Sequence, residues 1–127
     1  MVKKKMRTKK KEIGFYYKRK KIKLEVEVCG SVLKKFIGLM FSRREKASAL
    51  LFEFGEKRFA GIHSMFVFFP FIAIWLDERG KLVEINFVKP FKLYIFPKKT
   101  AKKLIEIPFN SRYKKFVKLS SMTERFK

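Results

Sequence analysis

The chain has 127 residues, the length of one ordinary domain, and 47% of them are hydrophobic, which is enough to build a core. Its 33 Lys and Arg residues against 11 Asp and Glu residues give a formal net charge of +22. A compact chain with that charge repels itself unless an anion neutralises it. Composition therefore excludes a chain that is disordered throughout, and it indicates an anionic partner: nucleic acid, an anionic membrane surface or an acidic protein.

The chain contains one cysteine, Cys29, and one histidine, His63. An intramolecular disulfide and a zinc site built from several Cys or His residues are therefore excluded. We expect no bound metal. The absence of a disulfide suits a reducing cytoplasm, and the basic N-terminus is not followed by the short apolar run and cleavage site of a secretory signal. We expect a cytoplasmic protein.

The first part of the chain predicts a tail, two strands and a helix. Residues 1–12 are strongly basic and lack apolar periodicity, so we expect a flexible tail followed by one domain over residues 13–127. Strands are predicted for 13–17 and for 21–28, where apolar and charged residues alternate. Behind Ser31 as N-cap, apolar residues recur at helical spacing and predict a short amphipathic helix over 31–41.

The second part predicts further strands separated by turns. Asp77–Gly80 has the composition of a hairpin turn, with Gly80 able to take positive φ. The four prolines are expected at strand ends or edges: Pro70, Pro90, Pro97 and Pro108. The strands are expected at 49–54, 62–69, 71–77, 81–88, 91–96 and 102–107. Together the pattern predicts a mainly β fold with a minor α component: a compact antiparallel β-barrel-like or sandwich domain with one or two short helices and a basic N-terminal tail.

The run from Ala60 to Leu76 has an alternative interpretation. Its 17 residues carry no formal charge, which is near the lower limit for a membrane-spanning helix. Pro70 interrupts its second half, and the Asp77–Gly80 turn follows directly. We therefore favour strands, and we do not expect a membrane as partner.

Several motifs resemble one known family. Gly38-Leu39-Met40-Phe41 is followed by Arg43, and Trp75-Leu76-Asp77 precedes Gly80 at the family's spacing. Further matching pieces are Ala49–Phe54, His63-Ser64-Met65, Pro70, Lys81–Ile85, Lys89-Pro90, Tyr94, Pro97 and Leu104–Pro108. The chain resembles the domain of unknown function 192 family over about residues 31–110. The resemblance implies a small, compact, mainly β domain, and it implies no activity because none is established for the family.

The chain departs from the family's pattern at polar positions. Ile72 stands where members usually carry an Asp, and Phe66-Val67 stand where they often carry a polar pair. Asn110 replaces a common Gly, and Ser120-Ser121 replace a late Gly-Asp pair. If the family builds a polar site on these positions, this chain has lost it, while it has gained basic ends.

Catalytic chemistry has few candidates in this sequence. Cys29, His63 and Asp77 are the residues from which a nucleophile, base and orienting group would have to come. A single Cys after an apolar strand is typical of a core, and a single His in an apolar run is typical of a structural hydrogen bond. The chain has no glycine-rich phosphate loop. We expect neither an enzyme nor a bound cofactor.

The basic clusters favour RNA as the partner. Residues 1–23 carry 12 basic residues and one acidic residue, residues 81–127 carry 13 and 3, and the middle is near neutral. The predicted RNA-binding residues are Lys3, Lys4, Lys5, Arg7, Lys9, Lys10, Lys11, Lys18, Arg19, Lys20, Lys21, Lys98, Lys99, Lys102, Lys103, Arg112, Lys114, Lys115 and Lys118. Phe15, Tyr16 and Tyr17 are the candidates for stacking on bases, whereas most of the 16 Phe residues are expected in the core.

The functional hypothesis is an RNA-binding structural protein, ribosomal or ribosome-associated, that binds rRNA by phosphate contacts and has ribosomal proteins as possible neighbours. DNA stays open, because phosphate contacts do not distinguish the two nucleic acids. One alternative is a small-ligand or protein-binding β domain with no role in nucleic-acid binding. Another is a protein that binds anionic lipid at a membrane surface.

Overall fold

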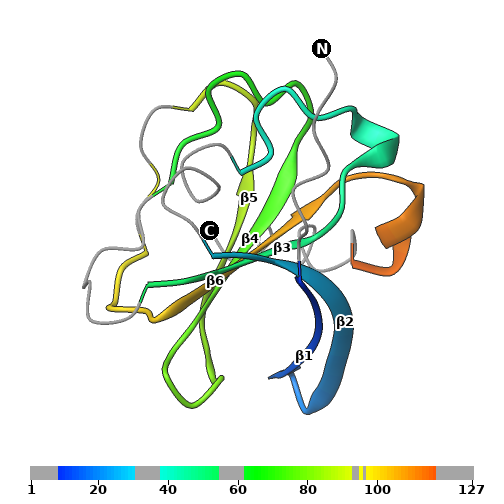
Figure 1. Cartoon of the computed structure of the whole chain (residues 1–127). Coiled ribbons are helices and arrows are strands. Elements are labelled where there is room, and N and C mark those ends of the chain that lie inside the picture. The colour runs from blue at the N-terminus through cyan, green and yellow to red at the C-terminus, as the bar shows by residue number, and fades with distance from the viewer. Residues whose placement is uncertain (1–8, 31–37, 55–61, 93–94, 96, 117–127) are drawn as a thin grey trace.

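The computed structural model describes residues 9–30, 38–54, 62–92, 95 and 97–116. Strands dominate this part of the chain, and two short 3₁₀ turns accompany them, so the mainly β prediction is confirmed (Figure 1). The elements are β1 (Lys9–Tyr17), β2 (Lys20–Cys29), η1 (Arg44–Lys46), β3 (Leu50–Glu53), β4 (Phe71–Leu76), β5 (Leu82–Val88), β6 (Lys103–Pro108) and η2 (Ser111–Tyr113).

The six strands form one sheet in the order β1-β2-β3-β6-β4-β5. The sheet curls until β1 approaches β5, which gives the half-barrel of Figure 1. Most neighbours are antiparallel, but β2 and β3 are parallel, with Glu27 opposite Leu50. The sheet is therefore mainly antiparallel, as predicted, and contains one parallel pair. The long connection between Cys29 and Leu50 carries the chain back to the same end of the sheet, as a parallel pair requires.

Two apolar layers form the core, one on each face of the sheet. The inner layer fills the curl and includes Ile13, Phe15, Leu24 and Val26. The outer layer lies under the loops that contain Leu39 and Val67. Strand β4 faces both layers: Ile72, Ile74 and Leu76 are in the inner layer, and Phe71, Ala73 and Trp75 are in the outer one.

The double burial of β4 explains the uncharged run that precedes Asp77. A central strand covered on both faces has no position for a charged side chain. Among the residues that the structure describes, no helix is long and apolar enough to cross a membrane.

The predicted helix over 31–41 is wrong for residues 38–41, and residues 31–37 lie outside the described part. Residues 38–41 form a turn in which Gly38 has φ +49° and Phe41 has φ +58°. Both values are incompatible with a right-handed helix. The side chains follow the turn: Leu39 is buried and Phe41 is exposed.

The predicted strands at 62–69 and 91–96 reduce to a single bridge between Ile62 and Ile95, with residues 93, 94 and 96 not described. Phe66, at φ +59°, turns the first segment, and the Val67 N–H donates to the Ser64 carbonyl at 3.1 Å. Ser64 is buried and joins both segments. Its Oγ accepts from the Lys92 N–H and donates to a backbone carbonyl, both at 2.6 Å.

The first strand begins four residues earlier than predicted, at Lys9. Lys9, Lys10 and Lys11 therefore lie in β1 and not in the expected tail, of which residues 1–8 lie outside the described part. The predicted turn at Asp77–Gly80 is confirmed. Gly80 has φ +83°, and Asp77 Oδ1 accepts two backbone hydrogen bonds at 2.9 Å within the turn.

Candidate nucleic-acid interface

The turn between β1 and β2 presents four consecutive basic residues. Tyr17 pairs with Lys20, which leaves Lys18 and Arg19 as a two-residue loop. Both have positive φ, at 48° and 68°. A two-residue hairpin loop with positive φ at both positions is normally Asn-Gly or Asp-Gly, because a Cβ in the left-handed region costs about 1–2 kcal/mol per residue. This hairpin therefore has two exposed cations in a conformation that is unfavourable for both.

The outer face of the hairpin places one aromatic ring among these cations. Tyr16 is 64% exposed, and the Lys21 Nζ lies 5.8 Å from its ring centroid. Gly14 makes room for this lysine, because a Cβ at Gly14 would lie 3.2 Å from the Lys21 Cε. Phe15 points inward and is 2% exposed, so its prediction as a stacking residue is wrong. Tyr17 is half-buried and packs against the inner layer.

Acidic residues limit the basic surface on the rest of the hairpin. Glu12 lies directly opposite Glu25, and Glu27 lies opposite Lys10. Both members of the Glu12–Glu25 pair are exposed, so like charges face each other across the strands. The positive charge of the hairpin is therefore concentrated at the Lys18–Lys21 turn.

A second basic group forms where η1 meets η2, and half of it was not predicted. Asn110 joins the two segments: its Nδ2 donates to the Arg44 carbonyl at 2.7 Å and to the Ala47 carbonyl at 2.9 Å. Hydrogen bonds from Ser111 also lower the pKa of Glu45, first from its hydroxyl and then from its backbone N–H. The segment with Arg43, Arg44 and Lys46 is thereby joined to the segment with the predicted Arg112, Lys114 and Lys115, and all six side chains are exposed. Arg44 and Lys114 line one shallow depression, and Arg112 Nη1 donates to the Ser48 Oγ at 2.9 Å.

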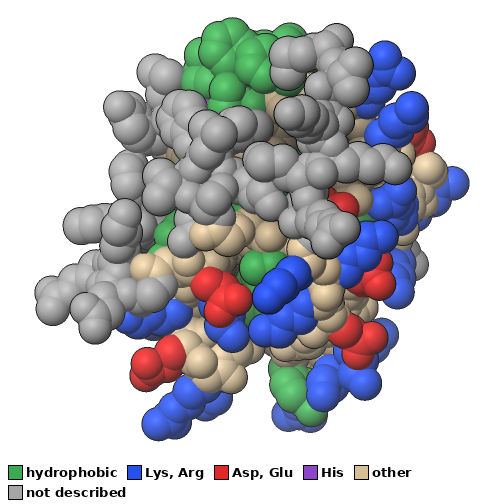
Figure 2. Space-filling view, viewed as in Figure 1, with side chains coloured by type: hydrophobic (Ala, Val, Ile, Leu, Met, Phe, Trp, Pro, Cys, Tyr) green, Lys and Arg blue, Asp and Glu red, His purple; other side chains and the backbone are tan. Residues whose placement is uncertain are grey.

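The hairpin and the η1–η2 group occupy one side of the molecule. Figure 2 shows Lys and Arg side chains along the right-hand and lower edges, over the elements that Figure 1 draws there, with several acidic side chains between them. We call the four turn residues and these six cations the basic flank.

The other predicted cations lie elsewhere. Lys98 and Lys99 are exposed, and Lys102 and Lys103 are half-buried where the chain enters β6. The Lys102 N–H donates to the Leu76 carbonyl at 2.9 Å, which places this segment at the end of β4, away from the hairpin. Lys3, Lys4, Lys5, Arg7 and Lys118 lie outside the described residues.

The three residues considered for catalysis are not brought together. Cys29 is buried at the end of β2. His63 Nδ1 accepts from the Met65 N–H at 3.2 Å in the loop before β4, whereas Asp77 caps the turn after β4. The whole length of β4 lies between the loop that contains His63 and Asp77 along the chain.

Among the described residues, four phenylalanines are exposed, which the sequence did not indicate. Phe41 and Phe68 are 61% and 62% exposed, and Phe66 and Phe91 are 44% and 46% exposed. Their rings touch in a chain: Phe41 stacks on Phe66 with centroids 5.1 Å apart, Phe66 meets Phe91 at 6.5 Å, and Phe91 meets Phe68 at 5.2 Å. We call these four residues the phenylalanine patch, and Figure 2 shows hydrophobic side chains gathered at the top of the molecule, where the loops that carry them lie.

A carboxyl group is buried in the outer layer. Glu106 of β6 lies between Leu50 of β3 and Ala73 of β4 and is 5% exposed. Burial raises its pKa to about 8, so this carboxyl is mainly protonated at neutral pH. Gly38 lies over it, because a Cβ at that position would be 3.3 Å from the Glu106 Oε1.

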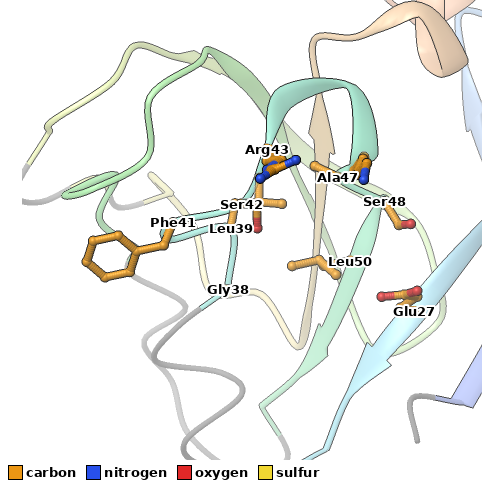
Figure 3. Close-up of a pocket in the computed structure, with 10 residues that line it drawn as sticks. Glu27, Gly38, Leu39, Phe41, Ser42, Arg43, Ala47, Ser48 and Leu50 are labelled. Carbon is orange, nitrogen blue, oxygen red and sulfur yellow. The ribbon is translucent and has the colours of Figure 1, made fainter. Parts of the chain in front are cut away.

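An open depression of about 940 Å³ lies between β2, β3 and the loop before η1. In Figure 3, Glu27 lies at one side, Arg43 at another and Leu50 at the floor, and Phe41 is also among the lining residues. The depression therefore combines one carboxylate, two cationic side chains (Arg43 and Lys46) and an apolar floor.

Comparisons with solved structures show the same fold. A candidate transcription regulator from Sinorhizobium meliloti 1021 superposes with a TM-score of 0.70 and 21% identity, covering 80% of this chain and 81% of that one. A protein of unknown function from Novosphingobium aromaticivorans gives a TM-score of 0.68 at 12% identity, covering 84% and 77%.

Sequence relatives come from Pyrococcus and Thermococcus species and have names that state no activity. A UPF0127 protein of Pyrococcus horikoshii is 32% identical over 84 residues, 66% of this chain and 72% of the relative. One of Pyrococcus furiosus is 29% identical over 91 residues, 72% and 78% of the two chains. The family model DUF192, described as "Uncharacterized ACR", matches residues 16–119. This match covers most of the chain and confirms the resemblance found in the motifs: the protein belongs to the DUF192 family.

Proposed function

We propose that this protein binds RNA through its basic flank, as a binding protein and not as an enzyme. The observation that carries the proposal is the β1–β2 turn, where Lys18 and Arg19 occupy positions that favour Asn and Gly. Unfavourable backbone conformations are often found at functional sites, where the required side chain outweighs the local cost. The net charge of +22 supports a polyanion as the partner.

We expect the binding free energy to come mainly from contacts between these cations and RNA phosphates. Each phosphate neutralised by Lys or Arg releases condensed counterions, so affinity falls as salt rises. Tyr16 adds one open ring beside Lys21, which suits a base next to a contacted phosphate. The other cations of the flank are exposed and have the length to follow a backbone.

The turn makes the proposal testable with a double variant, Lys18→Asn with Arg19→Gly. This variant has the favoured loop residues, so we expect its fold to be more stable by about 1–2 kcal/mol. We also expect weaker binding to single-stranded RNA, with the slope of log K against log salt reduced by about 1.4, because two cations are lost at about 0.7 each.

The matched control is Arg79→Ser with Lys81→Ser, which removes the same charge from the exposed β4–β5 turn. Its salt slope should stay close to that of the unmodified chain. Equal RNA affinity and equal slopes for the two double variants would show that net charge alone acts, and would refute a role for the hairpin.

The ribosome is our proposal for the source of the RNA. A small chain with strongly basic ends is typical of ribosomal proteins, and this composition supports rRNA over messenger RNA. Cosedimentation with ribosomal subunits on gradients of rising salt tests this step. Binding at near one copy per subunit in moderate salt is expected, and loss of the protein from every particle at low salt would refute a ribosomal role.

A second candidate function, small-ligand binding, is favoured by the depression between Glu27 and Arg43. Opposite charges over an apolar floor suit a small molecule with both an amino and a carboxyl group. Stabilisation of the chain by free amino acids, lost in Arg43→Ala, would support this candidate.

A further inference from the structure

Within the part of the chain that the structure describes, neither core layer includes the four residues of the phenylalanine patch. Its four side chains are 44–62% exposed, so they contribute little to either core layer. Contiguous exposed apolar patches on monomeric proteins are usually interaction sites. The three loops that form the patch belong to residues 38–43, 62–69 and 89–92.

The backbone directs these rings outward at a local cost. Phe41, Phe66 and Phe91 all have positive φ, at 58°, 59° and 61°, where bulky side chains are rarely found. Hydrogen bonds fix the loops in this arrangement. The Phe41 N–H donates to the Phe66 carbonyl at 2.9 Å, and the Phe91 N–H donates to the Ser64 carbonyl at 2.8 Å. Asn or Gly would fit these positions better, so the aromatic ring itself is the feature that requires explanation.

Charge decides what kind of partner fits. The three loops carry Arg43, Lys89 and Lys92, all exposed, and no Asp or Glu. A second copy of the chain would bring like charges together around the patch, which disfavours self-association. The partner is therefore anionic and has apolar faces to offer, as nucleic acid and anionic lipid both do.

The arrangement of the rings favours bases. The two most exposed rings are each supported by a second ring: Phe41 lies nearly parallel to Phe66, at 20°, and Phe68 meets the edge of Phe91 at 78°. Supported rings of fixed orientation are suited to stacking, which depends on the plane of the ring. Insertion into a bilayer requires apolar area but not a fixed ring plane.

We propose that the phenylalanine patch binds unpaired bases of single-stranded RNA, with Phe41 and Phe68 as the two stacking platforms. This proposal rests on the RNA-binding function proposed above, and it narrows the ligand to RNA with unpaired nucleotides. The flank would hold phosphates and the patch would hold bases, so a duplex of equal length should bind more weakly than a single strand.

The test is a single-stranded RNA that contains 2-aminopurine, whose fluorescence is quenched by stacking. The variant Phe41→Leu with Phe68→Leu keeps apolar side chains of similar size and removes the aromatic faces. We expect it to lose quenching and to bind roughly 10- to 100-fold more weakly, with an unchanged salt slope. The variant Phe41→Trp with Phe68→Trp should bind at least as tightly as the unmodified chain. Inorganic polyphosphate, which has charge and no bases, should bind all three chains equally.

The outcomes that contradict the base site differ from those that contradict RNA binding. Unchanged RNA affinity and quenching in the leucine variant would overturn the base site and leave RNA binding through the flank intact. Failure of the unmodified chain to bind any RNA would refute the proposed function and the base site together. Binding to anionic phospholipid vesicles that depends on the patch, alongside RNA binding that does not, would assign the patch to a membrane surface and overturn the proposal.

Discussion

The buried carboxyl of Glu106 makes the stability of this protein depend on pH in a defined direction. Its pKa is about 8 in the folded chain against an ordinary value of 4.5. Below pH 4.5 the group is protonated in both states and has no effect. Above pH 4.5 the unfolded chain loses the proton while the folded chain keeps it, so the free energy of unfolding falls. The decrease continues until pH 8 and then stops.

The variant Glu106→Gln isolates this contribution, because a glutamine of similar shape does not titrate. Each pKa unit corresponds to about 1.4 kcal/mol, so the stability of the variant relative to the unmodified chain should rise by about 3 kcal/mol between pH 4 and pH 7. The remaining lysines and carboxylates titrate equally in both chains, and their effect cancels in the difference.

Urea unfolding at a series of pH values measures this difference. The only tryptophan, Trp75, is fully buried in β4, so its fluorescence reports loss of the core. The change between pH 4 and pH 7 is the relevant quantity, since the amide introduced by Glu106→Gln adds a constant cost of its own. If the free energy of unfolding had the same pH dependence in the two chains, the protonated state assigned to Glu106 would be refuted.

Three further substitutions, one of them with a matched control, test the packing around the basic flank and the outer layer. Tyr113→Phe removes the hydroxyl that accepts from the buried Ala49 N–H at 2.8 Å, and it should lower the free energy of unfolding by about 1–3 kcal/mol in urea titrations. Gly38→Ala forces a side chain into positive φ and against a buried carboxyl oxygen, so it should lower the free energy of unfolding by about 2 kcal/mol or more. The control Gly30→Ala, with open space around it, should change this free energy little. Equal effects of the two substitutions would contradict the close packing assigned to Gly38. Asn110→Ala removes two hydrogen bonds to the η1 segment and should destabilise by about 2 kcal/mol, with faster amide hydrogen exchange over residues 43–48 as a second readout.

The sequence predicted the positions of the sheet strands well, because each strand has a strong local pattern. Alternation marks β2, a continuous apolar run marks β4, and the Asp77–Gly80 turn joins β4 to β5. The start of β1 was missed, because Lys9–Glu12 have no apolar pattern. Main-chain pairing with β2 is enough to hold these residues in the strand, and it leaves no signal in the side chains. The parallel pairing of β2 with β3 is likewise a long-range contact without a local signature.

The candidate site could be predicted only in part. Charge clusters along the sequence indicated the hairpin turn, but not that the segment of Arg44 lies against the segment of Lys114, since Asn110 joins these segments through tertiary contacts. The sequence of a loop does not show whether a phenylalanine side chain points into the core or into solvent. The exposure of Phe41 depends on a positive φ at this residue, which no residue type in the sequence indicates.

The most direct test of the central claim is the affinity of the full chain for single-stranded RNA over a range of salt concentrations. The four cations of the hairpin turn alone predict a slope of log K against log salt of about −3 or steeper. Saturable binding with such a slope is the expected result. No binding at low salt, or an affinity that does not change with salt, would contradict RNA binding through the basic flank.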